Sequence, residues 1–297
     1  MTSEQEWIEL GRRAALASHR LIGWIFWDPG AIERYAALGV PNGAGYYIAS
    51  RAAPLAAAGN QAVVAAFGSI HPFFVGAALD LCRAHATFEA AAAVRDAAVL
   101  DGLATYAPEV LSGLGELAEP MWAAADALPV AGRVLFAAHR EWPRPDDPAL
   151  SAWLAVNCIR EWRGDTHWAI QVAEGLSTTA SGLLDGAWRA YEDDWLPRSR
   201  GADGAMIAAA MVELEARGLA TDGRIDQRGI VYRQQLEDRL EAICAEPWRH
   251  LGEDLTRRFL DLVEPAGPRL MERVDATAGP NWMPAGRDRR APIEGRT

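Results

Sequence analysis

The segment at about residues 148–173 restricts the fold more than any other part of this sequence, because it combines helical periodicity with a polar face. At about 100° per residue, Asn157, Arg160, Arg163 and His167 fall on one side of the helix. Apolar side chains cover much of the remainder: Leu154, Cys158, Ile159, Trp162, Ala169 and Ile170. Such a face either meets bulk water or lines an internal polar cavity, and the sequence leaves both open.

The composition describes an acidic protein that favours helix. Half of the 297 residues are apolar, the net charge is −11 and the isoelectric point is about 5.1. This balance argues against broad contact with nucleic acid phosphates or anionic membranes. No apolar run approaches the ~18 residues that span a bilayer, and the polar, acidic first residues differ from a secretory leader. We therefore expect a cytoplasmic protein without membrane contact.

Motifs for metals and for common catalytic sites are missing. The three cysteines, Cys82, Cys158 and Cys244, are far apart and form no CxxC pair, so they predict buried, reduced thiols. The histidines have no HxxxH or HExxH spacing, and no GxSxG or GxGxxG motif occurs. The sequence predicts no metal site and names no cofactor.

Helix start and stop signals divide the first 180 residues. Asp28-Pro29 and Asp147-Pro148 each place an N-cap aspartate before a proline at the first helical position. Tyr46-Tyr47-Ile48 predicts a short strand. The pattern predicts helices at about 3–26, 73–85, 86–105, 107–117, 118–139 and 148–173.

The C-terminal part has the element order of a winged helix. A helix at about 205–217 closes at Gly218, a hairpin follows at about 219–225, and Asp226 caps a helix that runs to about Ala245. Arg217-Gly218-Leu219, Asp222-Gly223 and the Asp226-x-x-Gly229 spacing resemble the MarR-type winged-helix pattern. A degenerate counterpart is proposed near the N-terminus, where a short helix at residues 33–40 ends in Gly and Val before the Asn42-Gly43 turn.

These patterns predict a mainly α, multi-helical fold with a C-terminal winged-helix-like unit and its small β-hairpin. The predicted divisions are a helical domain with a candidate pocket at 1–180, a winged-helix-like domain at 181–264, and a disordered tail at 265–297, which is rich in Pro, Gly and Arg.

Several phrases are similar to an actinobacterial family that carries a helix-turn-helix label. They lie at residues 50–55, 63–67, 71–72, 160–167 and 246–252. The resemblance spans about residues 14–262 and implies a nearly all-helical protein that ends in a winged-helix-like unit, without implying an activity. This chain departs from the family pattern at residues 68–70, and at Trp162, Thr166 and Trp168, which would reshape a pocket.

The polar face of the 148–173 segment is the first candidate site. Arg160 and Arg163 carry guanidinium groups that suit a carboxylate or phosphate, and His167 suits proton transfer near neutral pH. We assign catalytic roles to His167, Arg163 and Asp165 as a hypothesis. The alternative is a solvated helix face, or a buried Arg–Asp network that fixes neighbouring helices.

Further candidates complete a ligand-binding set. Pro72 places His71 at an interruption between helices, where it either faces a cavity or caps a helix. Arg51 either reaches a ligand or pairs with an acid. Large aromatics beside polar groups are typical of pockets. The predicted ligand-binding residues are Arg160, His71, Arg51, Asn157, Trp168 and Trp162.

The supposed recognition helix argues against DNA as a partner. Before Arg217 it contains no Arg, Lys, Asn or Gln, and Glu213 and Glu215 would repel phosphate. Arg224 and Arg228 of the wing are too few to provide much affinity for the DNA backbone.

The sequence leaves three functional hypotheses. The first is a protein that binds a small organic, anionic molecule in a central cavity. The second is a ligand-responsive transcription regulator of MarR type, and the third is an enzyme of secondary metabolism that uses His167 as acid or base. Whether the chain catalyses a reaction or forms a homodimer is left open.

Overall fold

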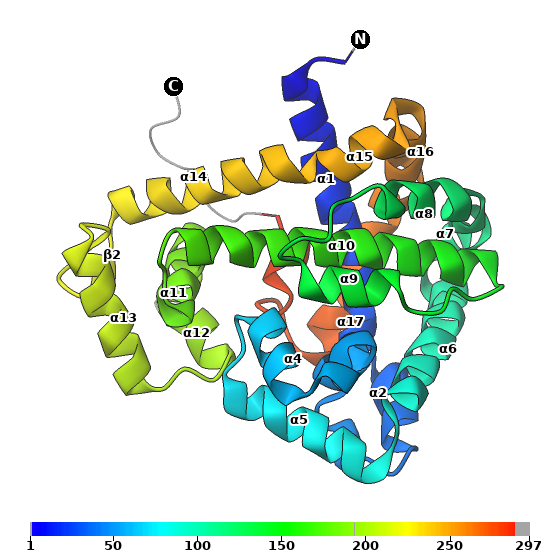
Figure 1. The fold of residues 1–297 in the computed structure, drawn as a ribbon, viewed down its shortest axis with the longest axis horizontal. Helices are drawn as coiled ribbons and strands as arrows, with labels where there is room; N and C mark the ends of the chain where they lie inside the picture. The colour runs from blue at the N-terminus through cyan, green and yellow to red at the C-terminus, as the bar shows by residue number, and fades with distance from the viewer. Residues whose placement is uncertain (1, 193, 289–297) are drawn as a thin grey trace.

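The computed structural model describes residues 2–192 and 194–288 and is mainly α-helical (Figure 1). In this part of the chain the only sheet is an antiparallel pair, β1 (Ala220–Thr221) and β2 (Arg224–Ile225). The prediction of a mainly α fold with a small hairpin is confirmed. Before the hairpin the helices are α1 (Glu4–Gly23), α2 (Pro29–Ala36), α3 (Tyr46–Ala52), α4 (Asn60–Phe67), α5 (Pro72–His85), α6 (Phe88–Tyr106), α7 (Pro108–Leu114), α8 (Ala118–Asp126), α9 (Val134–Arg140), α10 (Pro148–Ala173), α11 (Thr178–Trp188), α12 (Trp195–Ser199) and α13 (Gly204–Ala216). After it come α14 (Gln227–Cys244), α15 (Glu246–Leu251), α16 (Glu253–Val263) and α17 (Gly267–Thr277).

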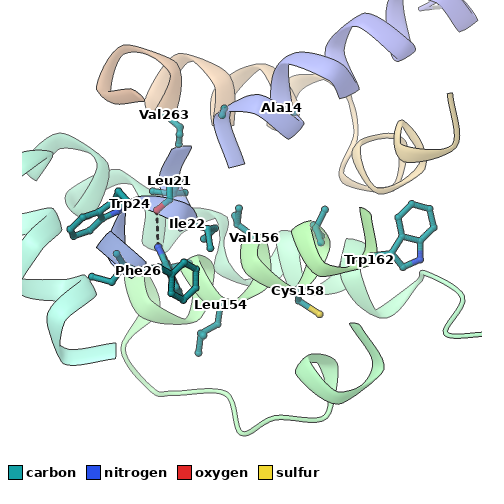
Figure 2. Packing of buried hydrophobic residues seen from close by; sticks show 14 of the residues in the cluster. Ala14, Leu21, Ile22, Trp24, Phe26, Leu154, Val156, Cys158, Trp162 and Val263 are labelled. Atoms are coloured by element: carbon teal, nitrogen blue, oxygen red, sulfur yellow. Dashed lines mark hydrogen bonds between the residues drawn. The ribbon is translucent and has the colours of Figure 1, made fainter. Parts of the chain in front are cut away.

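Helix α10 crosses the centre of the molecule, with α14 running along it and α1 crossing both (Figure 1). Its start follows from Asp147, whose side chain accepts from the backbone N–H of Leu150 at 2.8 Å, and from Pro148 at the first position. Figure 2 shows Leu21 and Ile22 of α1 over the stretch of α10 that carries Leu154 and Val156. Most of α10 is therefore buried.

One large hydrophobic core joins both ends of the chain, from Leu10 in α1 to Val274 in α17. A smaller cluster lies around α3, α4 and α5, between Ile48 and Leu79, and includes Leu135 of α9. The predicted boundary at residue 180 stays a prediction, although residues from both sides of it share the large core.

Gly11 allows the first helix to lie against the C-terminal part. A Cβ atom added at Gly11 would lie 2.9 Å from the Cα atom of Ala245, so the two backbones meet without a side chain between them. We expect Gly11→Val to lower the free energy of unfolding by about 1–3 kcal/mol, because the backbones must separate. Gly204→Val is the control, since nothing lies within 4 Å of that position. Equal urea midpoints for the two variants would contradict this packing.

The winged-helix order is present at the C-terminal side. Helix α13, the β1–β2 hairpin and α14 follow one another, with Asp226 capping α14 through bonds from the N–H groups of Arg228 and Gly229. Helix α11 packs on α13 and α14.

The predicted N-terminal counterpart has no hairpin. Residues Tyr46–Ala52 form helix α3, so the strand predicted at Tyr46-Tyr47-Ile48 is wrong. Tyr46 is buried, with its ring centroid 5.4 Å from that of Tyr35, and this tertiary packing outweighs the strand preference of its neighbourhood.

Two other expectations need correction. The helix predicted at 118–139 is divided into α8 and α9 by a connection that contains Pro129 and Gly132. The tail predicted to be disordered at 265–297 contains α17, whose Leu270, Met271 and Val274 are buried in the core. Residues 289–297 lie outside the described residues.

Candidate functional site

A cavity of about 690 Å³ lies beside the polar face of α10. Helices α1, α3, α4, α11 and α14 contribute to its walls, as do the segment around Arg200 and the C-terminal residues from Met283 to Asp288. Of the predicted residues, those that line it are Arg51, His71, Arg160, Arg163, His167 and Trp168.

Glu161 holds two of these arginines in place. Its fully buried carboxylate accepts two bonds from Arg51, at 2.8 and 2.6 Å, and also pairs with Arg160. Burial alone would raise the pKa of Glu161, but Arg160 and Arg51 hold it well below its ordinary value. Arg51 also donates to the hydroxyl oxygen of Tyr47 at 2.8 Å. Arg51 therefore pairs with an acid, as one of its two predicted roles requires, and it also lines the cavity.

A second network joins α10, α11 and α14. Glu237 accepts from Arg163 at 2.6 Å and from Arg233 at 2.8 Å, while Asp185 accepts from Arg233 at 2.8 Å and from Arg189 at 2.9 Å. These residues line the cavity. Buried Nε of Arg163 and Nη1 of Arg233 have no hydrogen-bond partner among the described residues. The network thus leaves two guanidinium donors unused.

Arg200 is a further cation on the cavity wall. Its guanidinium carbon lies 5.7 Å from the ring centroid of Trp282, and no carboxylate in residues 2–192 or 194–288 forms an ion pair with it. Burial lowers the pKa of Arg200, and repulsion from Arg51 adds to that lowering. The site therefore holds more positive than negative charge near Arg200.

The two cavity histidines of α1 and α10 are neutral at pH 7. Burial lowers the pKa of His167 to about 4, with Arg233 adding to the effect. Burial, followed by Arg163 and Arg160, places the pKa of His19 well below its ordinary value. Each neutral imidazole offers one acceptor nitrogen and one N–H donor, and Nε2 of His19 has no partner among the described residues.

Three predicted residues do not line the cavity. Buried Asn157 accepts from Arg160 at 3.0 Å, behind the wall. Asp165 lies two residues from His167, and so its side chain is on the other side of the helix. There its carboxylate accepts from the backbone N–H of Phe136 at 2.9 Å. Trp162 is fully buried and donates to the carbonyl of Pro129 at 3.2 Å. The prediction that Asn157, Trp162 and Asp165 belong to the site is therefore not met by the lining of this cavity.

His71 combines both of its predicted roles. Its Nδ1 accepts from the backbone N–H of Phe73 at 3.2 Å and so caps α5. Its backbone N–H donates to the carbonyl of Arg200 at 2.8 Å, which fixes the Arg200 segment against α5. The ring also forms part of the cavity wall.

A family model described as a helix-turn-helix family matches residues 11–277. The chain belongs to this helix-turn-helix family. No curated protein and no solved structure matches the chain. Within the described residues of this family member, no helix is long and apolar enough to cross a membrane, and no three His, Cys, Asp or Glu side chains are placed to hold a metal ion.

Sequence reasoning missed half of the charged wall of this helix-turn-helix protein. The missed residues come from α1 (His19), from α11 and the segment after α12 (Asp185 and Arg200), and from α14 (Arg233 and Glu237). Arg233 and Glu237 stand four residues apart on α14, a spacing that predicts a pair on one face but not its burial. Only the packing of α14 along α10 brings this pair to the cavity.

Glu241 supplies a pH-dependent test of the cavity wall. Burial, and then repulsion from Glu237, raises the pKa of Glu241 to about 7. Its ionised form is thus disfavoured in the folded state, so stability falls as pH rises from about 4.5 to 7. We expect Glu241→Gln to be more stable than the parent by about 1–2 kcal/mol at pH 8, allowing for its partial exposure, and nearly equal at pH 4.5. An equal difference at both pH values in urea titrations would contradict this environment.

Proposed function

We propose that this helix-turn-helix family protein binds a small anionic organic molecule in the cavity beside α10. The observation that carries this proposal is a set of unused cationic donors on one wall: Arg200, Nε of Arg163 and Nη1 of Arg233. They occur in a chain whose net charge is −11, so a general excess of basic residues does not account for them.

The energetic argument favours an anion over water alone. A buried donor without a partner costs about 1–3 kcal/mol, and more when it is charged. A carboxylate or phosphate can accept from several guanidinium donors at once in charge-assisted bonds. His167 and His19 can contribute one further donor each. An anionic ligand would therefore satisfy groups that the described side chains leave without partners.

Mass spectrometry under native conditions, on protein purified from its own host, tests the proposal without knowledge of the ligand. We expect a mass excess that disappears on denaturation and is reduced in Arg200→Gln. Arg12→Gln is the matched control, since Arg12 lines the same cavity but already pairs with Glu9 at an exposed position. Protein that carries no small molecule, and whose melting temperature no organic anion raises, would overturn the proposal.

Catalysis is a second proposal at the same site, because neutral His167 can accept a proton inside the cavity. Arg163 remains the candidate for stabilising negative charge. Asp165 is not available to orient His167, because it lies on the other side of α10 and binds the backbone N–H of Phe136. If the bound molecule is a substrate, His167→Ala is expected to abolish its turnover while preserving the fold by circular dichroism.

Regulation of transcription is favoured by membership of the family, and the surface of α13 provides its test. The exposed side of α13 is formed by small or acidic side chains: Ala205, Ala208, Ala209, Val212 and Glu215. Arg217 is bound to Glu174 and Tyr232, and Arg228 to Asp226. We expect no gel shift with the DNA upstream of its own gene at low salt. A saturable shift that survives competitor DNA would instead support a regulator.

A further inference from the structure

An aromatic wall adjoins the arginines of the cavity. Tyr47 lies between two other rings of that wall, with centroid distances of 6.3 Å to Trp27, which it stacks upon, and 6.1 Å to Phe67. Phe26 meets Tyr47 edge-on at 5.1 Å. Trp27 and Tyr47 are only half-buried, so part of their surface remains open. Trp27 and Tyr47 therefore form a surface that suits a planar apolar body, with Phe26 and Phe67 buried behind them.

Arg51 joins the aromatic wall to the charged one. Its guanidinium carbon lies 4.6 Å from the centroid of the Phe67 ring and 5.7 Å from that of Tyr47, while the same group binds Glu161. Arg200, which has no ion pair among the described residues, lies near the same rings: its guanidinium carbon is 5.7 Å from the ring centroid of Trp282, which is 4.7 Å from that of Trp27. A molecule that contacts Trp27 and binds Arg200 therefore has its acidic group close to its ring system. A long chain between ring and acid would separate them further than this arrangement requires.

The charges of the wall indicate how many negative charges the molecule carries. Three carboxylates pair with the arginines: Glu161, Asp185 and Glu237. Eight arginines line the cavity, and two of them, Arg12 and Arg287, pair with Glu9 and Asp275. The other six are Arg51, Arg160, Arg163, Arg189, Arg200 and Arg233. Glu241 also lines the cavity and, with a pKa of about 7, is mostly ionised at pH 8. Because guanidinium groups stay protonated in proteins, two positive charges are left over at that pH, and the neutral histidines do not change this count. A single carboxylate would leave one of the two without a counter-charge.

We propose that the cavity binds a planar aromatic dianion, either a phosphate monoester or a dicarboxylate whose acidic groups are attached close to the ring. This inference rests on the proposed function and narrows its ligand class. The volume of about 690 Å³ accommodates an organic molecule with one or more rings. The ring system lies on Trp27 and Tyr47, and the anionic groups accept from Arg200, Arg163 and Arg233.

Calorimetric titration with four probes at pH 8 tests this ligand class. The probes are naphthyl phosphate, naphthalene dicarboxylate, naphthoate and decanoate. We expect at least one of the two dianions to bind about tenfold more tightly than naphthoate. A tenfold difference in affinity is what one added charge-assisted hydrogen bond contributes. Whichever dianion binds better identifies the acidic group. Decanoate, which has no ring, is expected to bind weakest.

Two variants test where the charge and the ring lie. Arg200→Gln is expected to remove most of the advantage of the dianion over naphthoate, and Trp27→Leu to weaken the three naphthyl probes but not decanoate. Circular dichroism checks that each variant is folded, and Arg12→Gln is the control. Tighter binding of decanoate or naphthoate than of both dianions would overturn this inference and leave the anion site in place. Failure of all four probes to bind would count against both proposals.

Discussion

Glu161→Gln is expected to lower the free energy of unfolding by about 3–5 kcal/mol, among the largest effects of a single substitution in this protein. The change preserves the shape of the side chain but removes the charge that Arg51 and Arg160 share. Since Glu161 is fully buried, two guanidinium groups are left without their counter-charge at a site that water reaches poorly. Urea unfolding followed by circular dichroism measures the loss.

The same substitution has a signature that ordinary core damage lacks. Sodium sulfate should recover more stability in Glu161→Gln than in the parent, because the sulfate ion can replace the missing carboxylate in the cavity. Glu9→Gln is the control, since it removes an exposed pair with Arg12 and should cost less than about 0.5 kcal/mol. A Glu161→Gln protein as stable as the parent would show that solvent already screens these arginines.

Trp162→Ala is expected to lower the free energy of unfolding by about 3–5 kcal/mol, whereas Trp168→Ala should cost less than half of that. Trp162 is fully buried, donates to Pro129 and has the guanidinium carbon of Arg133 at 4.3 Å from its ring centroid. Trp168 is half-buried on the cavity wall, next to Gly68. Removing the Trp168 ring leaves a space that water can enter from the cavity. Removing the Trp162 ring leaves an empty cavity in the core, which costs more stability.

The two tryptophan variants should also differ in binding. Trp168→Ala is expected to change the affinity for an anionic ligand because the ring faces the cavity. Trp162→Ala, where it remains folded, should bind as the parent does. If both variants lost equal stability and equal affinity, the division of α10 into a core side and a cavity side would be wrong.

Periodicity explains how much of the site the sequence could predict. Arg160, Arg163 and His167 share a face because positions three and four residues apart lie on one side of a helix, and the cap at Asp147-Pro148 fixes where that helix begins. Asp165 entered the predicted site through its nearness in sequence, yet its position on the helix turns it toward α9. Glu161 pairs with Arg51 and Arg160, but nothing in its neighbouring sequence distinguishes it from an exposed glutamate, so its role could not be predicted.

Tertiary packing explains the errors in the fold. Tyr46-Tyr47-Ile48 has the composition of a strand, but Tyr46 and Ile48 are buried in two different clusters, which a helix allows. Proline, glycine and arginine suggested a disordered tail, whereas Leu270, Met271 and Val274 give α17 an apolar side. Arg200 follows a short helix without an amphipathic pattern, so the sequence does not predict that α12 packs on α11 or that His71 binds the carbonyl of Arg200.

Crystals soaked in sodium iodide give the most direct measurement of whether the arginine wall binds anions. Iodide is located by its anomalous scattering and needs no assumption about the natural ligand. We expect an iodide peak inside the cavity, in contact with Arg200 or with Nη1 of Arg233, at iodide concentrations where exposed arginines such as Arg257 remain unoccupied. Iodide on the outer surface with none in the cavity would contradict the account.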